Sequence, residues 1–192
     1  MGMMRFFVVT WCCITLVGCS KPSAEESFSA AEKAQHEAEA SFDVSGAFQD
    51  SLFNAAIELY ERVVEDHPDN PLAELALFRK AELHNNGLRN FPDAIGTFRR
   101  YLAMYPNTPQ APVSLFMMGF LYANELRQLD SAAAVYRRFL ASYPEHELSG
   151  SARAELDNLG KSPEEIIEKQ LALVRESDEK KSGSEADKKA NQ

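Results

Sequence analysis

The stretch "FRRYLAMYP", residues 98–106, returns nearly unchanged as "YRRFLASYP" at residues 136–144. A fainter copy, "YERVVEDHP", occupies residues 60–68, so the three copies begin 38 residues apart. Each copy ends in a proline, which cannot continue a helix. Three similar segments in one register, each with the same terminator, indicate a structural repeat.

Apolar residues in the three copies follow the period of an α-helix. They recur at positions i, i+4, i+7 and i+8, which lie on one face of a helix. Each copy is therefore predicted to be an amphipathic helix that its proline ends. The positions that coincide are Ala56, Ala94 and Ala132; Tyr60, Phe98 and Tyr136; Val63-Val64, Tyr101-Leu102 and Phe139-Leu140; and Pro68, Pro106 and Pro144.

Another helix is predicted in front of the two later copies. Its start repeats as Asn70-Pro71 and Thr108-Pro109, an N-cap residue followed by proline at the first helical position. Each unit is therefore a pair of antiparallel helices, and Ala94 and Gly119 are predicted to lie where helices touch. The residues that repeat along this first helix are Leu77 and Leu115, Phe78 and Phe116, Ala81 and Gly119, and Leu83 and Leu121.

An all-α fold follows from this pattern, because no part of the chain has the alternation of a strand. A lone hairpin cannot bury its apolar face, whereas stacked hairpins can. We therefore predict an αα-hairpin solenoid of about three repeats, with a period of 38 residues, over residues 28–160.

Both ends of the repeat region are atypical. The opening helix is expected around residues 24–40, and residues 41–51, "SFDVSGAFQDS", are interpreted as a long insertion with Gly46 as a helix breaker. The stretch "SPEE" from Ser162 predicts a capping box that opens a C-terminal capping helix over residues 161–176. The apolar stripe of that helix consists of Ile166, Ile167, Leu171 and Val174.

The last residues, 177–192, have no apolar side chain larger than alanine and mix acids with lysines. Such a segment buries too little surface to offset the entropy lost on ordering. It is therefore predicted to be a disordered tail.

Residues 1–18 are predicted to be a secretory signal rather than part of the fold. The apolar run at residues 6–17 is too short for a membrane-spanning helix but has the length of the apolar region of a signal. The run ends in "LVGCS", residues 16–20, which resembles the bacterial lipobox. The resemblance implies that the signal is cut before Cys19, that Cys19 carries lipid, and that residues 19–27 are a tether. An ordinary cleaved signal with an incidental cysteine is the alternative.

Lipidation would leave the mature chain without a free thiol. Cys12 and Cys13 lie inside the signal and leave with it, and Cys19 is used by the lipid. A disulfide, a cysteine nucleophile and a thiolate metal site are thereby excluded. Three acyl chains bury far more methylene groups than the single myristoyl chain that binds only marginally, so attachment is expected to be permanent.

The hairpin unit resembles the tetratricopeptide repeat. The pattern Ala-x3-aromatic-x7-Pro is that of the family, and Leu115, Met118-Gly119 and Tyr122 fall at its first-helix positions. The family's period is about 34 residues. The longer period here is explained by one extra residue in the turn within each pair and three in the loop between pairs. Lys80 and His84 depart from the family's apolar and tyrosine positions.

Bulky residues at Tyr101 and Phe139, with "YP" closing each unit, resemble bacterial envelope lipoproteins of the β-barrel assembly and Tol-Pal-associated kinds. This resemblance implies a lipid-anchored scaffold that binds other cell-envelope proteins. Ser20 is not the aspartate that retains some lipoproteins at the inner membrane, so the periplasmic face of the outer membrane is expected. The alternatives are a structural adaptor of a Tol-Pal, trafficking or motility apparatus, and a non-catalytic accessory subunit of an envelope enzyme.

Charge and motifs argue against other classes of function. The net charge is −9, whereas phosphate binding needs clustered lysine and arginine, so no nucleic-acid partner is expected. Arg99-Arg100 and Arg137-Arg138 stand among acids and are expected on solvated helix faces. The sequence has no phosphate loop, nucleophile elbow or paired-histidine metal spacing. We therefore predict a protein that is not an enzyme and uses no metal, cofactor or small-molecule substrate.

The family resemblance implies that first helices line a concave, peptide-binding groove. Asparagine side chains there can pair with a peptide backbone, and phenylalanines can hold its side chains. The alternative is that Phe78 and Phe116 are buried between helices and that the asparagines simply end them. The groove positions are Phe78, Glu82, Asn85, Asn86, Phe116, Phe120 and Asn124.

Membrane residence is expected to depend on Cys19 alone. Replacing the thiol in Cys19→Ala removes the acceptor of the lipid, so the precursor should stay unprocessed by the lipoprotein peptidase. Metabolic labelling with palmitate should show no label in the variant. Label that still enters Cys19→Ala would contradict the lipobox interpretation.

Overall fold

The computed structural model describes residues 21–41 and 46–175. The predicted signal, the lipidated Cys19 and the predicted tail over residues 177–192 lie outside the described residues. The elements in chain order are α1 (Ala24–Ala40), α2 (Gly46–Asp66), α3 (Pro71–Glu82), η1 (Leu83–Gly87), α4 (Phe91–Met104), α5 (Gln110–Phe120), η2 (Leu121–Glu125), α6 (Leu129–Ser142), α7 (Ser149–Asn158), and a further helix of residues 163–175.

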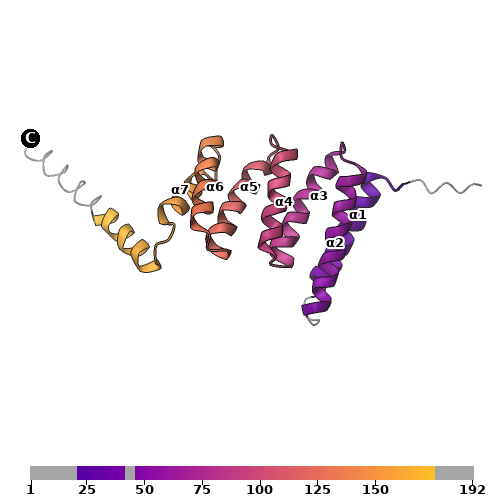
Figure 1. Cartoon of the computed structure of the whole chain (residues 1–192), viewed down its shortest axis with the longest axis horizontal. Coiled ribbons are helices and arrows are strands. Elements are labelled where there is room, and N and C mark those ends of the chain that lie inside the picture. The colour runs from indigo at the N-terminus through magenta and orange to yellow at the C-terminus, as the bar shows by residue number, and fades with distance from the viewer. Residues whose placement is uncertain (1–20, 42–45, 176–192) are drawn as a thin grey trace, which may run out of the picture.

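The helices form antiparallel pairs that stand side by side in chain order (Figure 1). The pairs are α1 with α2, α3 with α4 and α5 with α6, and α7 packs on α6. The described residues contain no strand. The predicted all-α solenoid with a 38-residue period is therefore confirmed.

The opening helix lies where the sequence predicts it, over Ala24–Ala40, whereas the tether and the insertion are shorter than predicted. The first helix starts at Ala24, because Ser23 accepts a hydrogen bond from the Glu26 amide at 3.1 Å and the Glu26 carboxylate accepts one from the Ser23 amide at 2.9 Å. Residues 24–27 thus belong to the fold rather than to a tether. The predicted insertion over residues 41–51 is wrong for its second half, since Gly46 begins α2 instead of breaking a helix.

The core is built from one aromatic ring in each second helix. Tyr60, Phe98 and Tyr136 are at most 1% exposed. The Tyr136 ring lies against Gly119, where an added Cβ would lie 2.7 Å from its Cε1. Ala94 is 0% exposed. The predicted close contacts at Ala94 and Gly119 are therefore confirmed.

The residue added to each turn is absorbed by a π-helical turn. The amides of Leu88 and Leu126 donate to the carbonyls of Leu83 and Leu121, each five residues earlier, at 3.0 Å. Such wide turns accommodate single insertions in a helix. The next residues, Arg89 and Arg127, have φ of 50° and 54°, where glycine is more usual. Both arginines lie in the turns predicted within the hairpins.

Lys80 departs from the family pattern because it pairs with an acid of the neighbouring helix. The Glu61 carboxylate of α2 accepts hydrogen bonds from Lys80 of α3 at 2.6 Å and from Arg100 of α4 at 2.5 Å. Burial alone would raise the pKa of Glu61, but the two cations lower it below its ordinary value. Glu61 therefore joins three helices, and the Arg100 side chain, 40% exposed, is only partly in solvent.

The array ends at α7, whose inner face follows the repeat while its outer face does not. Ser149 and Ala152 are buried at the positions of Ala111 and Ser114. On the outer face Arg153 and Asp157 are exposed at the positions of Leu115 and Gly119. A polar outer face is what a solenoid needs where stacking stops.

The helix of residues 163–175 begins with the predicted capping box. The Glu165 carboxylate accepts from the Ser162 amide at 2.7 Å, and the Glu165 amide donates to the Ser162 hydroxyl at 3.2 Å. Along this helix Ile166 is half-buried, and all other residues are exposed. Its stripe therefore lies largely in solvent, and Ile167 is 57% and Leu171 52% exposed.

Stability should separate a glycine at a close helix contact from one on an open helix face. In Gly119→Ala the new methyl group meets the buried Tyr136 ring, and such overpacking costs about 1–3 kcal/mol. In Gly96→Ala the methyl group meets nothing within 4 Å inside α4, and the better helix former should stabilise by about 0.5–1 kcal/mol. Thermal melting followed by circular dichroism should move in opposite directions for the two variants. A Gly119→Ala melt at or above the wild-type temperature would contradict the packing.

Mild acid should destabilise the fold through His84, which is buried in η1. Burial lowers the pKa of this imidazole below 6.5, and the charge of Lys80 adds to the effect. The unfolded chain then binds a proton more readily than the folded chain, so stability from His84 is complete above pH 6.5 and declines as the pH falls toward the folded-state pKa. Between about pH 7.5 and about pH 5.5, the melting temperature should fall less in His84→Leu than in the wild type. An equal decrease in melting temperature in the two proteins would show that groups other than His84 cause the pH dependence.

Candidate functional site

The residues predicted to form the groove lie on α3 with η1 and on α5 with η2. Each pair consists of a first helix and the π turn that ends it. The set comes together because both helices have the same register, offset by 38 residues. The structure divides it into aromatic residues between helices and polar residues at helix ends.

The phenylalanines at the middle of the two helices are half-buried against second-helix rings. Phe78 lies 6.0 Å from Phe98 and 5.7 Å from Tyr101, measured between ring centroids. Phe116 lies 5.7 Å from Tyr136 and 5.9 Å from Phe139. Both rings thus contribute to packing within their hairpins, as the alternative interpretation describes.

Polar groove positions are held by neighbours on their own helices. Glu82 accepts from Arg79 at 2.8 Å, and Asn85 donates to the Asn86 side chain at 2.9 Å. Asn124 donates to the Phe120 carbonyl at 3.1 Å. Asn86 and Asn124 are exposed, and each keeps donor or acceptor capacity for a partner.

Two hollows lie between the C-terminal ends of neighbouring first helices. The smaller one, about 350 Å³, lies between α1 and α3 with η1, and Glu82 and Asn86 line it. The larger one, about 590 Å³, lies between η2 and α7, and we call it the η2–α7 pocket. Its walls come from Ala123, Asn124, Arg127, Leu129, Ala154, Glu155, Asn158, Leu159, Gly160, Lys161, Ser162, Pro163 and Ile166.

The η2–α7 pocket exists because three positions shrink or become polar in the last repeat. The larger side chains at these positions of α5 pack against the core. In α7 the corresponding residues leave the space open. The replacements, 38 residues apart, are Phe116 by Ala154, Met117 by Glu155 and Phe120 by Asn158.

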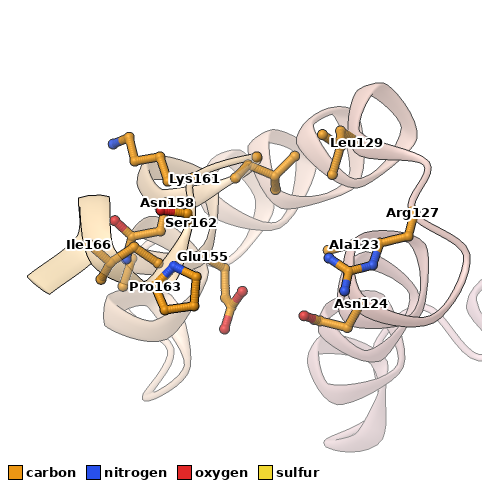
Figure 2. A pocket seen from close by; sticks show the side chains of 13 residues that line it. Ala123, Asn124, Arg127, Leu129, Glu155, Asn158, Lys161, Ser162, Pro163 and Ile166 are labelled. Atoms are coloured by element: carbon orange, nitrogen blue, oxygen red, sulfur yellow. The ribbon is translucent and has the colours of Figure 1, made fainter.

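One cation of the pocket lacks the acid that its counterpart has. Arg89 pairs with Glu125 of the next repeat at 3.4 Å and lies 5.4 Å above the Phe91 ring. Arg127 stands at the matching position, but Pro163 replaces the acid. Within the described part of the chain, Arg127 makes no ion pair. Figure 2 shows its guanidinium on the same wall as Asn124, with Glu155 and Pro163 on the opposite wall.

Asn124, one of the groove positions predicted from the sequence, lines this pocket. Arg127, Leu129 and Glu155 were missed because they match no functional position of the family pattern. The sequence indicates them only through the departure of α7 from the repeat. This departure is visible when Ala154 and Asn158 are aligned with the matching residues of α5.

The described residues contain neither a cluster of metal-ligating side chains nor a helix that could span a membrane. Among residues 21–41 and 46–175, no group of three histidine, cysteine, aspartate or glutamate side chains could hold a metal ion. None of the helices described there combines the length and the apolar character needed to cross a bilayer. The arrangement offers shape, apolar contact and single charges, which serve recognition.

Family models agree with the geometry. Two models described as tetratricopeptide repeat match residues 44–112 and residues 113–146. Together they span more than half of the 192 residues. No match was found among curated proteins.

Proposed function

The chain belongs to the tetratricopeptide repeat family, and we propose that it is a lipid-anchored scaffold for envelope proteins on the periplasmic face of the outer membrane. Repeats of this family indicate protein–protein interaction and are generally non-catalytic. The observation that carries the proposal is the row of first helices, whose ends leave two hollows bordered by Asn86 and Asn124.

Attachment at Cys19 would hold the repeats close to the bilayer. Ser23 caps the first helix, only four residues after Cys19. Four extended residues span at most about 14 Å. Lys21 pairs with Asp66 at 2.7 Å, so the chain is already directed along the end of α2 before α1 begins. A tether this short orients the array, because the α1–α2 end must remain near the lipid.

The η2–α7 pocket lies at the end of the array opposite α1 (Figure 1). A partner held there would be kept away from the anchor, which suits a protein that connects the membrane to a larger complex. Assembly of outer-membrane proteins is the process we favour for that complex. A structural adaptor of a Tol-Pal, trafficking or motility apparatus would use the same scaffold with different partners.

The groove is tested by replacing its amides. Asn86→Ala and Asn124→Ala each remove a side chain that can pair with a partner's backbone, and both lie near helix ends, where folding should barely change. A pull-down from solubilised membranes, read by mass spectrometry, should recover a defined envelope partner with the wild type and much less of it with the double variant. Recovery of a barrel-assembly protein, a Tol-Pal protein or a motility protein would each identify a different complex.

The matched control is Asn107→Ala, an exposed asparagine in the loop between α4 and α5. It should capture the partner as the wild type does. Melting curves of all variants should coincide. If the double variant retains the partner, the amide-bordered groove is not the working surface.

A further inference from the structure

We propose that the η2–α7 pocket receives an aromatic side chain of a partner protein, with an acid beside it in the partner's sequence that pairs with Arg127. The inference rests on the proposed scaffold function and specifies its partner chemistry. One repeat earlier, the chain itself provides both of these groups, an aromatic ring and an acid.

Phe120 is the internal counterpart of the aromatic half. In the preceding repeat this ring and the Met117 side chain are partly buried against the core. One period later Asn158 and Glu155 leave a hollow of about 590 Å³. Leu129 borders that hollow and is 39% exposed, although the corresponding Phe91 packs against the core. The pocket therefore has an apolar wall that is more exposed than its counterpart one repeat earlier.

Glu125 is the internal counterpart of the acidic half. Arg89 holds this carboxylate from a left-handed backbone position, and Arg127 has the same backbone conformation with φ of 54°. Lys161 adds a second cation at the rim, whereas Glu155 on the facing wall would repel a second acid. The charge pattern thus favours one carboxylate, placed on the Arg127 side of the ring.

Exposed apolar residues elsewhere give no comparable indication of a partner. The stripe of residues 163–175 is exposed, but it has no counterpart in the repeats that shows what covers it. The η2–α7 pocket has such a counterpart one repeat earlier, in the Arg89–Glu125 ion pair and the partly buried Phe120 ring, which is why we assign the docking to the pocket.

Peptide binding tests the assignment directly. The probes are capped peptides of about twelve residues on an alanine and serine background, with one phenylalanine and one glutamate separated by one to five positions. Fluorescence anisotropy with the full chain in detergent should show binding at one separation at least. Phenylalanine-to-alanine peptides should bind about tenfold or more weakly, and glutamate-to-glutamine peptides about two- to fivefold more weakly. Equal binding of all peptides, or of none, would overturn the proposal.

Variants of the chain locate the binding. Asn158→Phe restores the ring that α5 carries and should abolish peptide binding by filling the pocket. Arg127→Asn removes the cation while keeping a residue that tolerates positive φ, so it should bind glutamate and glutamine peptides equally. Arg89→Asn is the matched control, because it removes an equivalent arginine outside the pocket. It should keep the preference for glutamate. Wild-type behaviour of Asn158→Phe would overturn the proposal even if peptides bind.

Membrane pull-downs separate this inference from the scaffold function. If Asn158→Phe and Arg127→Asn recover the partner while Asn86→Ala loses it, the pocket assignment fails and the scaffold stands. If the wild type recovers no defined partner, the scaffold function fails. A second copy of the chain is the other candidate occupant. Sedimentation that shows a wild-type dimer and an Asn158→Phe monomer would overturn the assignment to a peptide.

Discussion

In the last hairpin, the ring in the middle of the second helix must lie against a residue almost without a side chain. Tyr136 and Gly119 show the constraint, because a single added carbon would come within 2.7 Å of the ring. The close approach lets each hairpin bury its aromatic residue completely and lets the next hairpin stack on it. Where the small residue becomes Asp157, no further ring can be accommodated and stacking stops. Both the length of the array and its polar end follow from this contact.

Features that depend on periodicity could be predicted from the sequence. Burial repeats every 38 residues because each copy meets the same neighbours, so one copy predicts the others. Contacts between copies were not predictable in this way. Glu61 takes Lys80 and Arg100 from two different helices, and nothing in their spacing selects these partners over other charges. The start of α2 was also missed, because a glycine can begin a helix as well as interrupt one.

The candidate site was predictable only where it follows the family pattern. Asn86 and Asn124 could be placed at helix ends because they repeat. The position of Phe78 can serve either a groove or the packing against the second helix, and the sequence does not decide between these roles. The ring contacts with Phe98 and Tyr101 show that Phe78 packs against the second helix. The η2–α7 pocket is defined by side chains that are absent. Searching a sequence for functional residues overlooks such a site, whereas comparing the copies for losses of volume finds it.

The end of the solenoid and the pocket are two results of one set of changes. A stack of apolar hairpins has to become polar at its last helix, or its outer face would aggregate. In α7 that change takes away the large residues facing η2 together with those facing outward, so Asn158 replaces Phe120 while Arg153 replaces Leu115. The inner wall, still apolar at Leu129, is left partly uncovered. Arg127 meanwhile loses the acid that a further repeat would have supplied. Termination of the fold thus creates, at the end opposite α1, a surface that only another chain can complete.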